Sequence, residues 1–361
     1  MKFSFNGLKR PILVAGPCAA ESASQLLRTA EALKRSGKVS LFRCGSWKVR
    51  SKPEGFEGIG EASFPVLQRI EKEMALPVSV EVASPAQVET LLRYGISCCW
   101  IGARTTVNPH QVAEIAEAAR DSGLSVLVKN PVAADLKLWE GAFERLLKAG
   151  LTDLAAVHRG FAVADASPYR NRPFWHLAIE WKRRHPEWPL ICDPSHIAGC
   201  RSLIPEVAQK ALNLNYDGLM LEVHPEPDAA LSDAAQQLTP QQFEKLLSGL
   251  RVPVVPTADG RLSSYRAVLD EIDSELLSLL SRRMEVSRQI ARVKMEEGLP
   301  LLQMERWREV LSSAVRQAGM LGLEPSFVEE WMQLVHSATL ELQEKVLGNQ
   351  DSLTAGEQKS R

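Results

Sequence analysis

The chain has 361 residues, which is too long for one ordinary hydrophobic core and indicates two or more domains. Its hydrophobic content of 45% and charged content of 24% are typical of a globular protein and exclude wholesale disorder and fibrous repeats. A net charge of -1 argues against a general nucleic-acid binder or a polybasic membrane binder.

The sequence gives no sign of a membrane or secreted protein. No apolar run approaches the roughly 20 residues that span a bilayer, and the N-terminal segment lacks the layout of a signal peptide. Six cysteines without regular spacing do not form the pattern of a disulfide framework. We therefore expect a cytoplasmic protein with neither nucleic acid nor a membrane as its partner.

Between residues 11 and 224, short β-rich apolar runs alternate with stretches of helical periodicity. The runs are Pro11–Gly16, Val39–Cys44, Pro77–Val82, Cys98–Ile101, Ser125–Val128, Leu154–Val157, Pro189–Cys192 and Gly218–Glu222. The helical stretches include Ser24–Ser36, Pro85–Tyr94, Pro109–Ser122, Leu138–Leu147, Pro173–Arg184 and Leu203–Leu212. Eight strand–helix units predict an α/β fold of the (β/α)8 TIM-barrel type over residues 1–250. A doubly wound sheet is the alternative, although no glycine-rich dinucleotide fingerprint follows the first run.

The pattern of apolar residues changes after residue 250. Residues 251–263 contain prolines and a glycine and are typical of a linker. Beyond it, periodicity predicts three helices over Ser264–Glu297, Leu302–Gly319 and Pro325–Leu347. We expect an all-α domain over 264–347 and a polar, disordered tail over 348–361.

Two sets of chemically active side chains follow the predicted strands, at the end of a TIM barrel where active sites lie. Cations suited to phosphate groups are Lys48, Arg50, Arg104, Lys129 and Arg159. A thiol, an imidazole and two carboxylates suit a borderline divalent cation: Cys18, His196, Glu222 and Asp233. Neither set has diagnostic spacing. Taken singly, each cation is more often solvated or paired, Cys18 is more often a buried thiol, and His158 and His224 could be packed core histidines.

The motifs AGPCAAES, GSWKVRSKPEGFEG, IGARTT, LVKNPV, HRGF and DPSH resemble the type I β class of 3-deoxy-D-arabino-heptulosonate 7-phosphate (DAHP) synthases over about residues 5–250. The resemblance implies a divalent metal held by Cys18, His196, Glu222 and Asp233. It implies a phosphoenolpyruvate site made by Lys48, Arg104, Lys129 and Arg159. It also implies that Arg50 and Ser51 hold erythrose 4-phosphate, in a motif where Val49 replaces the usual Pro and Ser51 the usual Thr. A sister family makes an eight-carbon product, but this stretch looks closer to the four-carbon users.

The chemistry of such a synthase fits these residues. An enol carbon attacks an aldehyde while water adds to the phosphate-bearing carbon, and a bound metal can polarise the aldehyde oxygen. The cations neutralise phosphates and hold the reactants together. Lys129 is our candidate for proton transfer, although a pure phosphate ligand would have the same pattern. The ligand set could take Mn, Fe, Co or Zn.

The first helix beyond the linker carries two cations beside its apolar stripe. Arg283 and Lys294 are 11 residues apart, about three helical turns, so they point the same way and call for anionic partners. Arg266 lies about a quarter-turn off that face and would serve another pocket or a partner chain. A helix of this length, roughly 50 Å, would overhang a small domain, which predicts a homodimer through the helical domain. The alternative is a dimerisation arm with solvated arginines.

Residues 262–347 resemble the all-helical (AroQ-class) chorismate mutases. The residues that match the family's chorismate-binding positions are Arg266, Arg283, Lys294, Arg306 and Gln343, with Thr339 in place of Ser. Gln303 and Trp307 stand where several members have Asp and Glu, and His336 has no matching role. The resemblance implies a unimolecular rearrangement that needs no cofactor, with Lys294 and Gln343 at the ether oxygen.

Together the two resemblances imply a fused, bifunctional enzyme of aromatic amino-acid biosynthesis (the shikimate pathway) that acts on small molecules. A second hypothesis keeps the barrel active but makes the helical domain a regulatory module, in which bound chorismate or prephenate gates the barrel allosterically. A third, a non-catalytic scaffold, is disfavoured because every expected metal position is filled.

Overall fold

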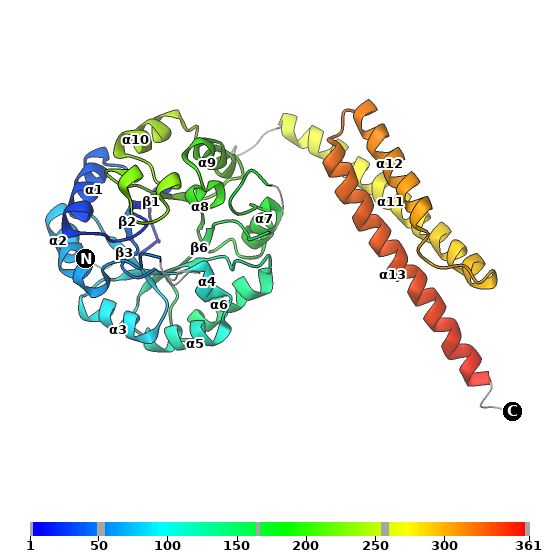
Figure 1. Cartoon of the computed structure of the whole chain (residues 1–361), viewed down its shortest axis with the longest axis horizontal. Coiled ribbons are helices and arrows are strands. Elements are labelled where there is room, and N and C mark those ends of the chain that lie inside the picture. Colours follow the sequence, from blue (N-terminus) through cyan, green and yellow to red (C-terminus); the bar gives the residue numbers. More distant parts are fainter. Residues whose placement is uncertain (1–2, 49–54, 164–166, 254–259, 358–361) are drawn as a thin grey trace. The chain divides into compact units, whose positions relative to one another are not determined.

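A computed structural model describes residues 3–48, 55–163, 167–253 and 260–357 (Figure 1). The chain divides into two compact units, Met1–Val254 and Val255–Arg361. In the first unit, eight parallel strands pair in chain order and the eighth pairs with the first, which closes a barrel. The predicted (β/α)8 barrel is confirmed, and the doubly wound sheet is excluded.

The strands of the barrel are short and fully buried. They are β1 Ile12–Gly16, β2 Leu41–Cys44, β3 Val78–Val82, β4 Cys98–Ile101, β5 Ser125–Lys129, β6 Leu154–His158, β7 Leu190–Cys192 and β8 Gly218–Glu222. Three of the predicted runs begin with a proline, Pro11, Pro77 and Pro189, and in each the strand begins one residue later. Proline has no N–H to donate to a neighbouring strand, so the regular pairing starts after it.

Helices surround the barrel (Figure 1). They are α1 Ala23–Ser36, α2 Phe64–Met74, α3 Pro85–Arg93, α4 Ala103–Thr106, α5 Pro109–Ala118, α6 Leu136–Lys148, α7 Trp175–Arg184, α8 Pro194–Ala198, α9 Ile204–Asn213 and α10 Pro240–Gly249. Helix α6 starts two residues before the predicted position because the side chain of Asp135 accepts a hydrogen bond from the Leu138 N–H and caps it.

Alternation along each strand divides the barrel residues between two cores. Outward-facing residues pack against the helices, whereas the inward-facing ones fill the barrel with Phe3 and Phe5, whose backbone N–H groups bond to Ser97 and Asp153. The inward cluster comprises Phe3, Phe5, Ile12, Val14, Leu41, Cys98, Trp100, Leu127, Ala155, Val157, Ile191 and Met220. The barrel is therefore packed rather than hollow, and a ligand must bind at its end.

The second unit consists of three helices, α11 Gly260–Glu296, α12 Met304–Met320 and α13 Pro325–Glu357, with α13 packed against the other two. Helix α13 continues past Leu347, its predicted end, since no proline stops it there. Among the helices that the structure describes, none combines the length and apolar character needed to cross a membrane.

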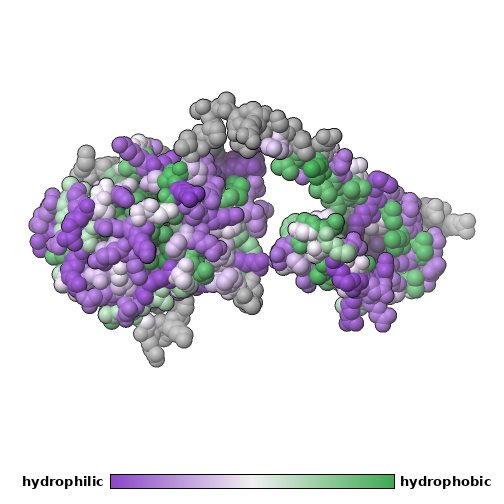
Figure 2. All heavy atoms as spheres, turned by 90° about the horizontal axis from the view of Figure 1, so that it is seen from above, coloured by the Kyte–Doolittle hydropathy of each residue, from purple (hydrophilic) through white to green (hydrophobic). Residues whose placement is uncertain are grey.

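The apolar stripe of α11 is exposed in the single chain. Its members Leu269, Ile272, Leu276, Leu279, Val286 and Ile290 are between 44% and 59% exposed. Figure 2 shows hydrophobic side chains on the surface of the helical unit. Among the side chains that the structure describes, the three helices bury few large apolar ones, such as Val328 and Val335, so one copy leaves this stripe uncovered.

Candidate active sites

The inward-facing side chains at the carboxyl ends of the barrel strands form a charged layer. The inward positions run in steps of two, so Arg43 follows Leu41 on β2 and Glu222 follows Met220 on β8. By the same rule, Glu81 and Lys129 occupy the last inward positions of β3 and β5, and Asp193 follows Ile191, the last inward residue of β7. All of these charged residues are buried. Arg43 Nη2 lies 3.0 Å from Glu222 Oε1 and Lys129 Nζ lies 2.8 Å from Asp193 Oδ2. This layer of paired charges is the floor of the candidate site.

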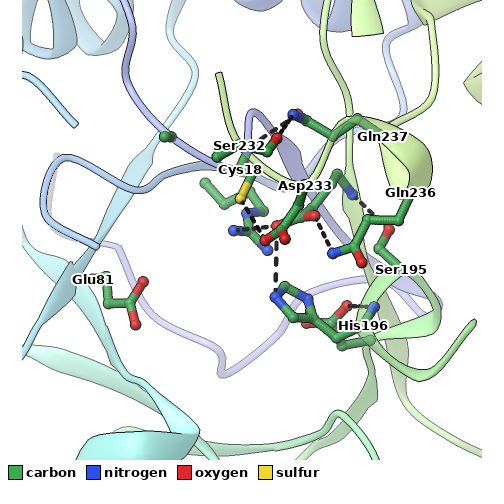
Figure 3. Close-up of polar contacts among 12 residues, drawn as sticks. Cys18, Glu81, Ser195, His196, Ser232, Asp233, Gln236 and Gln237 are labelled. Carbon is green, nitrogen blue, oxygen red and sulfur yellow. Dashed lines mark hydrogen bonds and ion pairs between the residues drawn. The ribbon is translucent and has the colours of Figure 1, made fainter. Parts of the chain in front are cut away.

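Three of the four residues predicted to hold a metal, Cys18, Glu222 and Asp233, come together at this floor, and the fourth, His196, lies beside Glu222. Figure 3 shows Cys18, Asp233 and His196 facing one another. Cys18 Sγ lies 3.2 Å from Asp233 Oδ2, and one ligand atom each of Cys18, Glu222 and Asp233 lie within 4.8 Å of one another. His196 Nε2 lies 3.8 Å from Glu222 Oε1. Residues up to 215 positions apart in the chain thus face one point.

Local structure fixes each of these side chains. Asp193 caps α8 by accepting from the His196 N–H at 3.1 Å, and its other oxygen lies 2.9 Å from His196 Nδ1. A proton on Nδ1 leaves the Nε2 lone pair toward Glu222, the arrangement that metal-binding histidines use. Gln237 joins the two loops that carry the other ligands, because it accepts from the Cys18 N–H and donates to Ser232 O.

Charge and burial suit a cation at this point. Burial and the nearby Glu222 raise the pKa of the Cys18 thiol, so a cation is needed to make it a thiolate ligand. Burial opposes ionisation of Asp233, but His196 and Arg170 outweigh it and lower the pKa of that carboxyl. A thiol, an imidazole and two carboxylates are a donor set that divalent transition metals accept. The residues present therefore fit a divalent metal ion.

Four of the five predicted phosphate-binding cations, Lys48, Arg104, Lys129 and Arg159, lie at the same end of the barrel. Lys48 Nζ lies 3.4 Å from Glu81 Oε2, and Arg159 donates to Asn171 Oδ1 at 2.5 Å. Burial lowers the pKa of Arg159 to about 10. Asp193 opposes this decrease, whereas the charges of Arg170 and Arg104 add to it. Arg159 therefore stays charged near neutral pH, within electrostatic reach of Arg104. The Arg104 side chain is exposed.

Not every prediction at this end can be followed. Arg50, Ser51 and the departure at Val49 lie outside the described residues. His158 faces outward on β6, where its Nε2 lies 2.6 Å from Pro173 O and its Nδ1 2.8 Å from the Tyr216 hydroxyl. It is a packed core histidine. His224 Nε2 lies 3.3 Å from Glu21 Oε2.

In the helical unit, three of the predicted residues meet between α11 and α13, and a fourth, Lys294, lies within electrostatic reach of α13. Arg283 Nη1 donates to Thr339 Oγ1 at 2.6 Å, and Gln343 Nε2 donates to Ser287 O at 3.3 Å. Lys294 donates a hydrogen bond to Leu301 O. Burial lowers the pKa of His336, and the charges of Arg283 and Lys294 lower it further. These cations therefore lie within electrostatic reach of one imidazole.

The remaining two predicted residues lie apart from this group. Arg266 is exposed on α11, and Arg306 pairs at 3.0 Å with Glu309 of its own helix. Within the described part of the chain, neither shares a hydrogen bond with Thr339 or Gln343. Arg306 lines a largely apolar cavity of about 700 Å³.

Comparison with known proteins identifies both parts of the chain. The family model described as DAHP synthetase I family matches residues 4–252. The chain belongs to this family. A second family model, chorismate mutase type II, matches residues 265–344, so the chain contains a DAHP synthase domain and a chorismate mutase domain. The resemblances inferred from the sequence are confirmed.

Individual relatives match the synthase domain. Phospho-2-dehydro-3-deoxyheptonate aldolase of Thermotoga maritima is 27% identical over 239 residues, which are 66% of this chain and 68% of that protein. The crystal structure of this enzyme (DAHP synthase) superposes with a TM-score of 0.59, 27% identity and coverage of 66% of this chain and 67% of that chain. A 2-dehydro-3-deoxyphosphooctonate aldolase of Desulfatibacillum aliphaticivorans is 27% identical over 275 residues, 68% of this chain and 92% of that protein.

Sequence reasoning missed several polar residues that support the synthase site. Arg43 had a readable signal, since an arginine at an inward position of a buried strand requires a carboxylate partner. Arg170 and Gln236 come from loops without any periodicity. Arg170 Nη1 lies 3.0 Å from Asp233 Oδ1 and Gln236 Nε2 donates to Glu222 Oε2 at 2.6 Å, so only the closed barrel reveals them.

Proposed function

We propose that the barrel condenses phosphoenolpyruvate, D-erythrose 4-phosphate and water to DAHP and phosphate with the help of one divalent metal ion. Cys18, His196, Glu222 and Asp233 would hold the metal, which would supply a Lewis acid for the aldehyde oxygen. The observation that carries this proposal is the cluster of Cys18, Glu222 and Asp233, with His196 beside Glu222 and two ion-paired lysines at the same barrel end.

In this reaction C3 of phosphoenolpyruvate forms a bond to the sugar aldehyde carbon. Water adds to C2, and the bond between C2 and the phosphate oxygen breaks to release phosphate. Lys48, Arg104 and Arg159 would bind the carboxylate and phosphate of phosphoenolpyruvate and orient its reacting carbon. Lys129 would bind there too and move a proton near C2. Burial lowers the pKa of Lys129. Asp193 raises this pKa, whereas the charges of Arg43 and Lys48 lower it. The lowered pKa makes the ammonium group a readier proton donor.

The choice of sugar rests on Arg50 and Ser51, which we propose bind the phosphate and chain of erythrose 4-phosphate. Relatives of this chain include both heptonate and octonate aldolases. The test measures phosphoenolpyruvate consumption by purified protein with erythrose 4-phosphate and arabinose 5-phosphate in parallel, with and without a chelator. Consumption with the four-carbon sugar alone, lost on chelation, supports the proposal. Preference for arabinose 5-phosphate would overturn it.

The helical domain would rearrange chorismate to prephenate without a cofactor. Arg283 and Lys294 would bind carboxylates, and Lys294 and Gln343 would stabilise charge at the ether oxygen. The donor for that oxygen would be Gln343 Nε2, which in the structure donates a long hydrogen bond of 3.3 Å to Ser287 O. Conversion of chorismate by the full chain tests this function.

The apolar stripe of α11 supports a homodimer formed by the helical domain. Six large apolar side chains on one helix are expensive to leave in water, and a second copy of α11 would cover them. Arg266, exposed on the same helix, and Arg306 would then complete chorismate sites near the interface. In that case a monomer would bind chorismate poorly.

A regulatory role for the helical domain is the second candidate. It is favoured by Trp307, which stands where several mutases have a carboxylate and which stacks on His336 at 3.9 Å. A pocket that binds chorismate or prephenate without turning it over could gate the barrel. Absence of chorismate conversion together with a ligand-dependent synthase rate would favour this candidate over the mutase.

A further inference from the structure

The helical unit contains a stacked pair of rings that the sequence did not explain. Trp307 of α12 and His336 of α13 lie with their ring centroids 3.9 Å apart and their planes 6° from parallel. Both side chains are half-buried. An indole stacked flat on an imidazole fixes the plane of that imidazole and therefore the direction of its nitrogens.

One nitrogen of this fixed ring has no partner. His336 Nε2 is buried, and no group within the described ranges forms a hydrogen bond with it. Buried polar atoms in folded proteins are nearly always satisfied, so an exception calls for a ligand or another explanation. Gln343 Oε1, seven residues further along α13, is a second such atom.

The helix places these atoms on one face. His336, Thr339 and Gln343 follow the spacing i, i+3 and i+7, which puts them on the same side of α13. Thr339 accepts a hydrogen bond from Arg283 of α11. The unpartnered nitrogen therefore lies on the face that carries the proposed chorismate-binding residues.

The surrounding charges decide what kind of group His336 can bind. Burial lowers the pKa of His336, and the nearby Arg283 and Lys294 lower it further, so the ring is neutral at neutral pH. A neutral imidazole is a poor partner for a carboxylate, which the two cations bind better. It is a good partner for a hydroxyl group. A hydroxyl can donate to Nε2 when that nitrogen carries no proton, and can accept from Nε2–H when it does.

We infer that His336 Nε2 contacts the ring hydroxyl of chorismate and that Trp307 is a positioning residue that holds the imidazole for this contact. The inference rests on the proposed mutase function. Trp307 occupies a position where other mutases have Glu, and an indole cannot accept a hydrogen bond from a hydroxyl. His336, the side chain on which Trp307 stacks, supplies from the neighbouring helix the hydrogen-bonding atom that a glutamate would offer at position 307.

The test compares chorismate with the analogue that lacks the ring hydroxyl, using the full chain. His336→Phe keeps a flat ring on Trp307 but removes the nitrogen, and His336→Gln keeps a hydrogen-bonding group. We expect His336→Phe to lower kcat/KM for chorismate by roughly tenfold and to leave kcat/KM for the analogue within about twofold. His336→Gln should stay within about threefold of wild type on both. Gln333→Ala, an exposed change on the same helix, is the matched control.

Trp307 is tested by the same ratio of the two kcat/KM values. Trp307→Ala should reduce the preference for the hydroxylated substrate, whereas Trp307→Phe should keep most of it. Equal losses on both substrates, or wild-type kinetics in His336→Phe, would overturn the inference while the mutase function stands. Failure of the wild-type chain to convert chorismate would instead overturn the mutase function and this inference with it. A thermal unfolding curve followed by circular dichroism that matches wild type verifies an intact helical unit, and His336→Leu on the same substrates replaces a variant that does not fold.

Discussion

The barrel and the helical domain carry their charged site residues in opposite settings. In the barrel, Arg43, Lys129 and Glu222 are buried and paired above a packed apolar interior. In the helical domain, Arg266 and Arg306 are exposed and the apolar stripe of α11 faces water. A closed barrel brings its site residues together within one chain. The three helices leave an apolar stripe and two of the predicted site cations exposed, which is the reason for proposing that a second copy completes this domain.

The largest effect that would sharpen this comparison is loss of one activity alone. Cys18→Ser or His196→Ala should reduce DAHP formation at least about a thousandfold, since each removes a ligand from the metal. Chorismate conversion should stay at the wild-type rate, because its site lies in another domain. Steady-state assays of both reactions on the same preparation measure this. Loss of both activities in folded protein would contradict separate sites.

The reciprocal change is next in size. Arg283→Ala removes the cation that bonds to Thr339, so chorismate conversion should fall by about a hundredfold or more while DAHP formation persists. Chorismate disappearance followed by absorbance measures the first reaction, with Arg282→Ala, an exposed residue of the same helix, as its control. A variant that converts chorismate normally would show that Arg283 lies outside the pocket.

A charge in the exposed stripe tests the dependence on a second copy. Leu279→Glu should weaken the dimer by at least about tenfold in Kd, because a carboxylate would be buried at the interface without a partner. Sedimentation velocity measures the change, and Ser274→Glu on the opposite face of α11 is the control. A monomeric wild-type chain with full mutase activity would break the comparison.

The smallest effect concerns the stability of the barrel against acid. Burial lowers the pKa of His158 from 6.5 to about 4. Between these values the unfolded chain binds a proton that the folded barrel does not, so stability is lost as pH falls through this window. From pH 7.5 to 5 this one group should account for about 2 kcal/mol of the decrease in the free energy of unfolding.

His158→Gln keeps a donor and an acceptor but does not titrate, so its stability should fall less over the same interval. Urea unfolding at the two pH values measures the difference, and His176→Gln, a change at a histidine outside the barrel core, is the control. Identical pH dependence in His158→Gln and wild type would show that His158 is not buried as a neutral ring.

The sequence by itself determined the architecture and most of the chemistry. Short β-rich apolar runs and helical stretches identified eight strand–helix units. The residues after each run pointed to the thiol, imidazole, carboxylates and cations, because a parallel barrel puts the strand ends on one face. In the helical domain, the sequence predicted the long helix α11, with Arg283 and Lys294 beside its apolar stripe. These features are local, so periodicity along the chain reveals them.

Only the tertiary structure decided which polar groups meet. Asp193 serves both α8 and His196, Arg43 neutralises Glu222 inside the barrel, and Arg170 reaches Asp233 from a distant loop. The stack of Trp307 on His336 joins two helices whose sequences show no relation to each other. Such contacts join residues far apart in the chain, and no local pattern encodes them because each depends on how the helices and strands pack.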